Sequence, residues 1–191
     1  DVESRRLDTI PGMTVLCPAS FQELRSMLRR AIYEVSGPVA VRYPRGGETE
    51  WCEDRSAGLA ALVRAGGAIT LVGYGTMIQT LLETAELLSH RGIEAEVIKL
   101  NTITPIDVDC IRASVQKTGR LLVAEDSVDM NCVGGRVISR LAAAGTYPRA
   151  FALQNIGSGF VPHGSVPQLR RLCGLDARSL CAKAEEVCKR A

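Results

Sequence analysis

Residues 68–92 read AITLVGYGTMIQTLLETAELLSHRG, and this stretch decides the fold class. The apolar run AITLVGYG predicts a buried strand, and TMIQTLLETAELLSHRG predicts a helix that ends at Gly92. Strands that alternate with helices in this way predict an α/β fold with an open, mostly parallel sheet. The same alternation continues with strands expected at 93–101, 120–126 and 149–157, and helices at 106–119, 132–145, 165–174 and 176–191.

An earlier strand–helix–strand unit occupies residues 14–45. Its helix, FQELRSMLRRAIYEV, is amphipathic, and Ser20 with Glu23 forms the pattern of a capping box. Two strands and one helix cannot bury a core alone, so residues 1–46 are expected to be the C-terminal end of a second, incomplete α/β domain. Residues 47–66 lose all periodicity and are predicted to be a linker, with at most a short turn of helix or strand near its end. Residues 67–191 are predicted to form a complete domain.

Composition excludes several classes of function. The net charge is only +2 and few aromatic residues lie among the basic ones, which argues against nucleic-acid binding. No run is long and apolar enough for a membrane helix, and the acidic, polar start does not follow the signal-peptide pattern. The seven cysteines show no CxxC spacing, so neither a zinc site nor a disulfide framework is indicated. We therefore expect a reduced, cytoplasmic protein that contacts neither nucleic acid nor membrane.

The segment VRYPRGG brings Arg42 and Arg45 to the carboxyl end of a predicted strand. Ligands gather at this end of parallel strands, and the planar arginine fork can bind phosphate or carboxylate oxygens through both of its arms. Pro44 stiffens the turn that follows. Arg42 and Arg45 are therefore candidate anion-binding residues. The alternative is that Arg42 pairs with a carboxylate between domains and that Arg45 is solvated.

Two loops carry weaker candidates. The turn GYGTM, at 73–77, could present backbone amides to an anion at a helix N-terminus, but it lacks the third glycine of a dinucleotide motif. A tight turn with Thr76 as the N-cap is the favoured interpretation. His163, in FVPHGS, could shuttle a proton or contact a substrate, although a histidine in such a loop more often packs or caps it.

Three carboxylates, Glu125, Asp126 and Asp129, follow the strand RLLVAED. Such a cluster could ligate a metal or form an acid/base pair, but no histidine lies nearby in sequence and the EF-hand spacing is absent. An exposed loop or an interface is the favoured interpretation. No residue of the chain is thus predicted to be catalytic or to ligate a metal.

Several motifs nevertheless resemble one family in order along the chain: GPVAVRYPRG, GYGTM, NTITPIDVDCI, LLVAEDSV, FVPHGS and CGLDARSL. From about Ile10 to its end, the chain resembles the C-terminal part of the 1-deoxy-D-xylulose-5-phosphate synthases, in the transketolase superfamily. The resemblance implies a sheet of the transketolase C-terminal-domain type, preceded by the end of a domain that binds the pyrimidine of thiamine diphosphate. It also implies a homodimeric enzyme that uses thiamine diphosphate and magnesium.

Enzymes of this family join pyruvate, after decarboxylation, to glyceraldehyde 3-phosphate for isoprenoid precursor synthesis. By the resemblance, Arg42 would bind the phosphate of the aldehyde acceptor and Arg45 would support it. The family's metal and diphosphate motif, its activating glutamate and its catalytic histidines lie upstream of the matched region. The chain alone is therefore expected to be inactive and to bind no cofactor. It would supply acceptor-phosphate binding and a dimer scaffold to the missing N-terminal domains or to a separate subunit that carries them.

The sequence departs from the family at three places. NTITPID, at 101–107, replaces RF-KPLD and is closer to the β subunits of 2-oxoacid dehydrogenases. MNCVGGR, at 130–136, replaces MGGAGS, and GSG, at 157–159, replaces GLPD. Two alternatives therefore stay open. One is a transketolase-like or 2-oxoacid dehydrogenase E1 β-type subunit, and the other is a non-catalytic scaffold domain.

Overall fold

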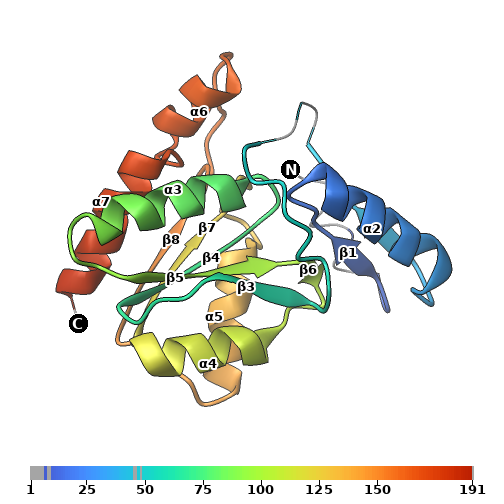
Figure 1. Ribbon diagram of the computed structural model, residues 1–191, viewed down its shortest axis with the longest axis horizontal. Coiled ribbons are helices and arrows are strands. Elements are labelled where there is room, and N and C mark those ends of the chain that lie inside the picture. Colours follow the sequence, from blue (N-terminus) through green and yellow to red (C-terminus); the bar gives the residue numbers. More distant parts are fainter. Residues whose placement is uncertain (1–6, 8–9, 45–46, 48, 191) are drawn as a thin grey trace.

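A computed structural model describes residues 7, 10–44, 47 and 49–190 and contains a larger and a smaller β-sheet. The larger sheet has five strands in the order β3-β5-β4-β7-β8 (Figure 1). Strands β4, β5, β7 and β8 are parallel, and only β3 runs antiparallel, against β5. The predicted open, mostly parallel α/β sheet is thereby confirmed. The bounds are β3 Ala60–Arg64, β4 Ile69–Tyr74, β5 Ala95–Leu100, β7 Arg120–Ala124 and β8 Ala150–Gln154.

Helices cover both faces of this sheet (Figure 1). Helices α3 and α7 pack on one face and α4 and α5 on the other, while α6 projects beyond the sheet. Strand residues alternate between the two resulting cores, so that Leu71 of β4 lies in the α3/α7 core and Val72 in the α4/α5 core. No helix in the described part of the chain is long and apolar enough to cross a membrane. The bounds are α3 Met77–Ser89, α4 Val108–Thr118, α5 Val133–Ala143, α6 Val166–Leu172 and α7 Ala177–Lys189.

The smaller sheet joins the N-terminal unit to the rest of the chain. Strand β1 (Thr14–Leu16) pairs in parallel with β2 (Val39–Val41), as predicted, and antiparallel with β6 (Thr102–Thr104), which the sequence did not predict. Only Asn101 separates β6 from β5, so the chain passes from the larger sheet directly into the smaller one. Val15 and Cys17 of the N-terminal unit lie in the α4/α5 core. The unit therefore buries its first strand against the larger sheet.

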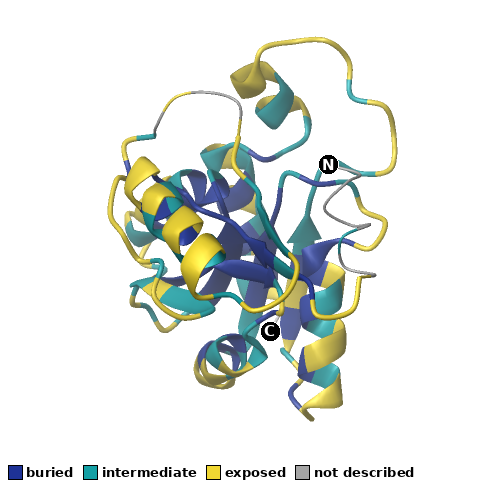
Figure 2. Cartoon of the chain, turned by 90° about the vertical axis from the view of Figure 1, so that its right-hand side faces the viewer, coloured by how far each residue is buried: buried dark blue, intermediate teal, exposed yellow. Residues whose placement is uncertain are grey.

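Helix α2 (Phe21–Tyr33) begins with half of the predicted capping box. The Ser20 hydroxyl accepts a hydrogen bond from the Glu23 amide at 3.1 Å, but the Glu23 carboxylate accepts from the Ala19 amide instead of from Ser20. Met27 and Glu23 point inward, whereas the predicted apolar stripe is largely exposed, with Ile32 at 70%. Figure 2 views the molecule from the side that carries α2, whose outer surface is mostly exposed. The helix thus presents apolar side chains to its surroundings.

A buried ion pair ties α2 to the larger sheet. The Lys99 ammonium lies 2.9 Å from a carboxylate oxygen of Glu23, and neither side chain is accessible to solvent. Glu23 also accepts from the Arg55 amide at 3.0 Å, and Lys99 also donates to the Asn101 side chain. Burial lowers the pKa of Lys99, although Glu23 opposes this effect. This cluster joins α2, the segment before β3 and strand β5.

Gly66 packs so closely on β5 that no side chain fits there. A Cβ atom at Gly66 would lie 2.2 Å from the carbonyl carbon of Ala95, whereas one at Gly67 would meet nothing within 4 Å. We expect Gly66→Ala to lower the free energy of unfolding by about 1–3 kcal/mol, because backbone must shift to admit the methyl group. Gly67→Ala is the matched control and should change it by less than about 0.5 kcal/mol. Equal urea midpoints for the two variants would contradict this packing.

Candidate functional site

The candidate site lies where three strands end. Arg42 follows β2, the turn that contains Thr76 follows β4, and Glu125 with Asp126 follows β7. The sequence singled out each of these segments separately, and the fold brings them together at the carboxyl ends of parallel strands. This is the usual position of ligand sites in α/β sheets.

Arg42 is held in a defined orientation by contacts that include an ion pair and an aromatic ring. Its guanidinium nitrogen Nη2 lies 2.8 Å from Asp126 Oδ1, and the group stacks over the Tyr74 ring at 5.4 Å from the centroid. Its backbone amide donates to the Leu16 carbonyl at 2.8 Å. Burial alone would lower the pKa of Arg42, but Asp126 and Tyr74 more than offset this and raise it. The result is a charged, preoriented guanidinium that remains 22% exposed.

Glu125 holds the Tyr74 ring on which Arg42 stacks. Its carboxylate accepts from the Tyr74 hydroxyl at 3.0 Å, from the Ser127 hydroxyl at 2.7 Å, and from the amides of Val133 and Gly134 at 3.0 and 2.8 Å. Burial, followed by the charge of Glu125, raises the pKa of Tyr74 well above its ordinary value. The expectation of an exposed carboxylate loop is wrong for Glu125, which is 1% exposed. The physical reason is that the carboxylate satisfies free amides at the start of α5.

The turn after β4 contacts two arginines. Thr76 is the N-cap residue of α3, as predicted, but its side chain makes no capping hydrogen bond. Its hydroxyl instead accepts from Arg170 Nη2 at 2.8 Å. A Cβ atom at Gly75, which has a φ of +55°, would lie 3.6 Å from Arg42 Nη1. The turn is therefore a tight contact surface between Arg42 on one side and α6 on the other.

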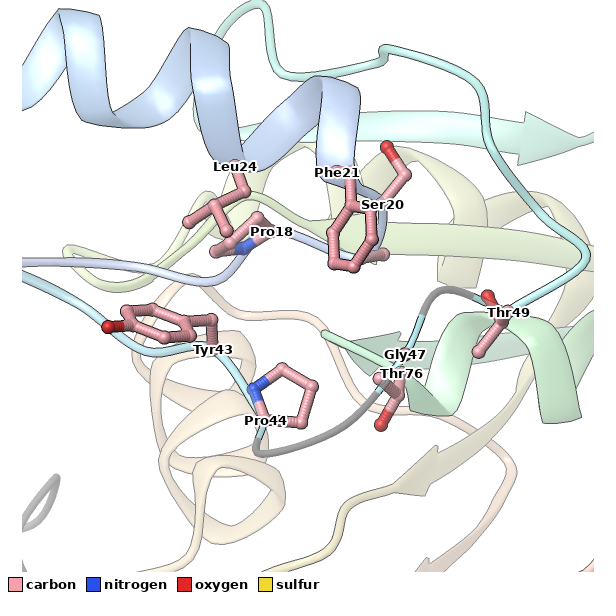
Figure 3. A pocket seen from close by; sticks show the side chains of 10 residues that line it. Pro18, Ser20, Phe21, Leu24, Tyr43, Pro44, Gly47, Thr49 and Thr76 are labelled. Carbon is pink, nitrogen blue, oxygen red and sulfur yellow. The ribbon is translucent and has the colours of Figure 1, made fainter.

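Three adjoining hollows surround Pro44. A pocket of about 360 Å³ is lined by Arg42, Tyr43 and Asp126, among others. A wider, mainly apolar groove of about 610 Å³ runs from Asp126 towards α6. The third hollow, of about 30 Å³, lies between Pro44 and the start of α2, with Tyr43 and Phe21 at its rim (Figure 3). A small ligand entering the pocket or the groove would thus reach the Arg42–Asp126 pair.

Two of the remaining predicted residues, His163 and Asp129, do not join this site. Arg45 lies outside the described residues. His163 is exposed in the loop before α6, and Asp129 is exposed and accepts from the Asn155 side chain at 3.1 Å. Within the described residues, no three acidic, thiol or imidazole side chains come together as a metal site would require. The sequence missed the role of Tyr74, although an aromatic residue at the end of a buried strand next to two glycines was a usable signal.

Comparisons with known proteins agree with this architecture. The family description "Transketolase, C-terminal domain" matches residues 58–180. The 1-deoxy-D-xylulose-5-phosphate synthase of Chlorobaculum tepidum is 35% identical over 190 residues, which cover 96% of this chain and 29% of that protein. The synthase of Desulforudis audaxviator is 35% identical over 184 residues, which cover 94% and 29%. The chain therefore spans less than a third of the length of these curated relatives.

A solved structure shows the same fold. The structure described as "Split gene transketolase, inactive beta4 tetramer" has a TM-score of 0.78 and 25% sequence identity to this chain. The match covers 97% of this chain and 60% of the other. It thus includes the N-terminal unit as well as the larger sheet.

Proposed function

The chain belongs to the transketolase C-terminal domain family, and on this premise we propose that it forms the C-terminal portion of a thiamine-diphosphate-dependent synthase. The proposed enzyme joins pyruvate, after decarboxylation, to glyceraldehyde 3-phosphate and makes 1-deoxy-D-xylulose 5-phosphate. Similarity to synthases of this name over almost the whole chain supports this reading. The observation that carries the chain's own role is the preoriented, partly exposed guanidinium of Arg42 at the carboxyl end of β2.

Arg42 suits the phosphate of a small acceptor for chemical and geometric reasons. A guanidinium presents paired N–H groups that match phosphate oxygens, and such charge-assisted hydrogen bonds are stronger than neutral ones. The Tyr74 ring fixes the plane of the group, and the adjoining pocket of about 360 Å³ has room for a ligand of a few atoms. We assign Arg42 to acceptor-phosphate binding, with Arg45 as a supporting residue.

The cofactor does not fit the residues described here. Thiamine diphosphate binds through a divalent metal, and the described residues offer no cluster of metal ligands. In the proposed enzyme, the cofactor and magnesium are held by an N-terminal portion, on the same chain or on a separate subunit, and this chain supplies the acceptor site and a scaffold for a homodimer.

The surface of α2 is the proposed contact for that N-terminal portion. Phe21, Leu28 and Ile32 are seven and four residues apart, about two turns and one turn of helix, so they lie on one side of α2. Their side chains are 54%, 41% and 70% exposed. Within the described residues, strand β2 pairs only with β1, so its other edge can accept a further strand. An exposed apolar helix face beside an open sheet edge is typical of a surface that another polypeptide covers.

The proposal predicts a specific kinetic defect. In the complete enzyme, Arg42→Ala should raise the KM for glyceraldehyde 3-phosphate more than tenfold, because a charge-assisted hydrogen bond contributes about 1.5–3 kcal/mol. The KM for pyruvate should stay within about twofold of the parent value, since the donor does not use this phosphate contact. Arg112→Ala, on the exposed side of α4, is the control and should change neither constant. An unchanged acceptor KM in Arg42→Ala would refute the assignment.

A second candidate function is favoured by the structural comparison. The similarity to a split-gene transketolase, with a TM-score of 0.78 over 97% of this chain, supports a transketolase-like subunit with a different acceptor. The intact mass of the gene product in its own cells shows whether the cofactor-binding portion is on the same chain or on a separate subunit. A mass roughly three times 20.5 kDa indicates one continuous enzyme, whereas a mass near 20.5 kDa indicates a separate cofactor-binding subunit. Assays of the complete enzyme with glyceraldehyde 3-phosphate or with another aldehyde as the acceptor then distinguish the two activities.

A further inference from the structure

We propose that Asp126 determines the specificity of the acceptor site by competing with the ligand for Arg42. Its carboxylate occupies the guanidinium when no ligand is bound, and a doubly charged phosphate displaces it whereas a singly charged carboxylate does not. This inference rests on the proposed phosphate site at Arg42 and adds a residue that neither the family match nor the resemblance assigns.

The ion pair lies where an incoming ligand must meet it. Arg42 and Asp126 are joined at 2.8 Å, and their side chains are 22% and 30% exposed. Both line the pocket of about 360 Å³, and Asp126 also lines the groove of about 610 Å³. An anion that approaches Arg42 from either hollow therefore encounters the negative charge of Asp126 before or together with the guanidinium.

Asp126 can move aside without a change in the backbone. The residues on both sides of it are anchored to the strand β8 and the loop after it: the Glu125 amide donates to the Gln154 carbonyl at 3.0 Å, and the Ile156 amide donates to the Ser127 carbonyl at 3.0 Å. A side-chain rotation is enough to turn the carboxylate from Arg42 into the groove. Arg42 meanwhile keeps its Tyr74 ring contact and its backbone hydrogen bond. The pair can thus open while the binding group stays in place.

Competition of this kind selects for charge. A phosphate monoester carries a charge of roughly −1.5 to −2 at neutral pH and three acceptor oxygens, so it offers the guanidinium more than Asp126 does. A monocarboxylate offers only what Asp126 already provides, and it must also approach against the charge of Asp126. Pyruvate, the proposed donor, is a monocarboxylate. Asp126 would therefore keep the donor out of the acceptor's anion site.

The test measures anion binding at Arg42 directly in the 191-residue chain. The probes are inorganic phosphate, glycerol 3-phosphate and acetate. Their binding is measured from the NMR signal of the Arg42 side-chain N–H, which is assigned by its absence in Arg42→Lys. In the parent chain, both phosphates should shift this signal and acetate should not. In Asp126→Asn, phosphate should bind about tenfold more tightly, and acetate binding should become measurable.

Two further variants make the result specific. Asp129→Asn removes one negative charge from the same loop but does not free Arg42, so it should leave both affinities within about twofold of the parent. Asp126→Ala leaves no side-chain oxygen at this position, whereas the amide oxygen in Asp126→Asn could still accept from Arg42, so the gain in Asp126→Ala should equal or exceed that in Asp126→Asn. Thermal unfolding midpoints check that each variant is folded.

The outcomes separate the two proposals. If phosphate shifts the Arg42 signal equally in the parent chain, Asp126→Asn and Asp129→Asn, the role of Asp126 is overturned and the phosphate site stands. If phosphate does not act on Arg42 in any variant, the phosphate site falls and the role of Asp126 falls with it. A gain for phosphate without any gain for acetate would overturn the selectivity part of the inference.

Discussion

Lys99→Met is expected to lower the free energy of unfolding by about 3–5 kcal/mol, which is the usual cost of removing one partner of a buried ion pair. The substitution leaves the Glu23 carboxylate charged in a site with no solvent access. Methionine has nearly the volume of lysine, so the loss comes from charge and hydrogen bonding and not from a cavity. Urea unfolding, followed by circular dichroism, measures the change.

The control for Lys99 is a lysine in an exposed ion pair. Lys183 lies 3.6 Å from Glu186, with side chains 36% and 54% exposed, and Lys183→Met should change stability by less than about 1 kcal/mol. The double variant with Glu23→Leu and Lys99→Met should recover only part of the loss, because it leaves no buried charge but deprives the Ala19 and Arg55 amides of their acceptor. A single variant as stable as the Lys183 control would show that the pair does not hold α2 to the sheet.

Glu125→Ala should cost about 3–5 kcal/mol, because it leaves several buried donors without an acceptor. Two of them are backbone amides at the start of α5, which lose both a hydrogen bond and the favourable charge at a helix N-terminus. The Tyr74 hydroxyl also loses its partner, so the ring that orients Arg42 becomes less restrained. The variant should therefore weaken phosphate binding in addition to stability.

Asp129→Ala is the matched control in the same loop. Asp129 is exposed and bonded to a single side chain, so its removal should cost less than about 1 kcal/mol. Thermal unfolding and the phosphate titration at Arg42 give the two readouts. If Glu125→Ala lost stability but bound phosphate normally, the support of Arg42 through Tyr74 would be disproved.

The regular elements could be predicted because each leaves a local pattern in the sequence. Strands such as β4, with every residue buried, leave long apolar runs, and helices such as α4 end at a glycine, here Gly119 with a left-handed φ of +70°. Strand β6 was not predicted because it has only three residues. Strand β3 is as long as β7, but its residues do not alternate between buried and exposed, so it was read as at most a short turn of helix or strand. Thr102–Thr104 reads as a turn before a proline, and its pairing with β1 depends on residues distant in the chain.

The site was predictable only in part, because its residues come from segments that are distant in the chain. The position of Arg42 follows from the rule that strand ends collect ligands, but its partner Asp126 lies 84 residues away and only the fold brings the two together. The alternative in which Arg42 pairs with a carboxylate agrees with the Arg42–Asp126 ion pair in the structure. Lys99 was a usable signal that went unused, since a lysine inside an otherwise apolar strand requires a buried partner. Glu23, read only as a capping residue, is that partner.

The position of β6 has a consequence for the order of folding. Strand β1 pairs with β2, which lies nearby in sequence, but it is also the antiparallel partner of β6, which follows β5. Closing so long a loop is entropically costly, so β1 is expected to dock only after β4 and β5 have paired. On the ribosome, β1 and β2 would therefore stay uncovered until β6 has emerged, and they would be among the last of the described strands to reach their native contacts.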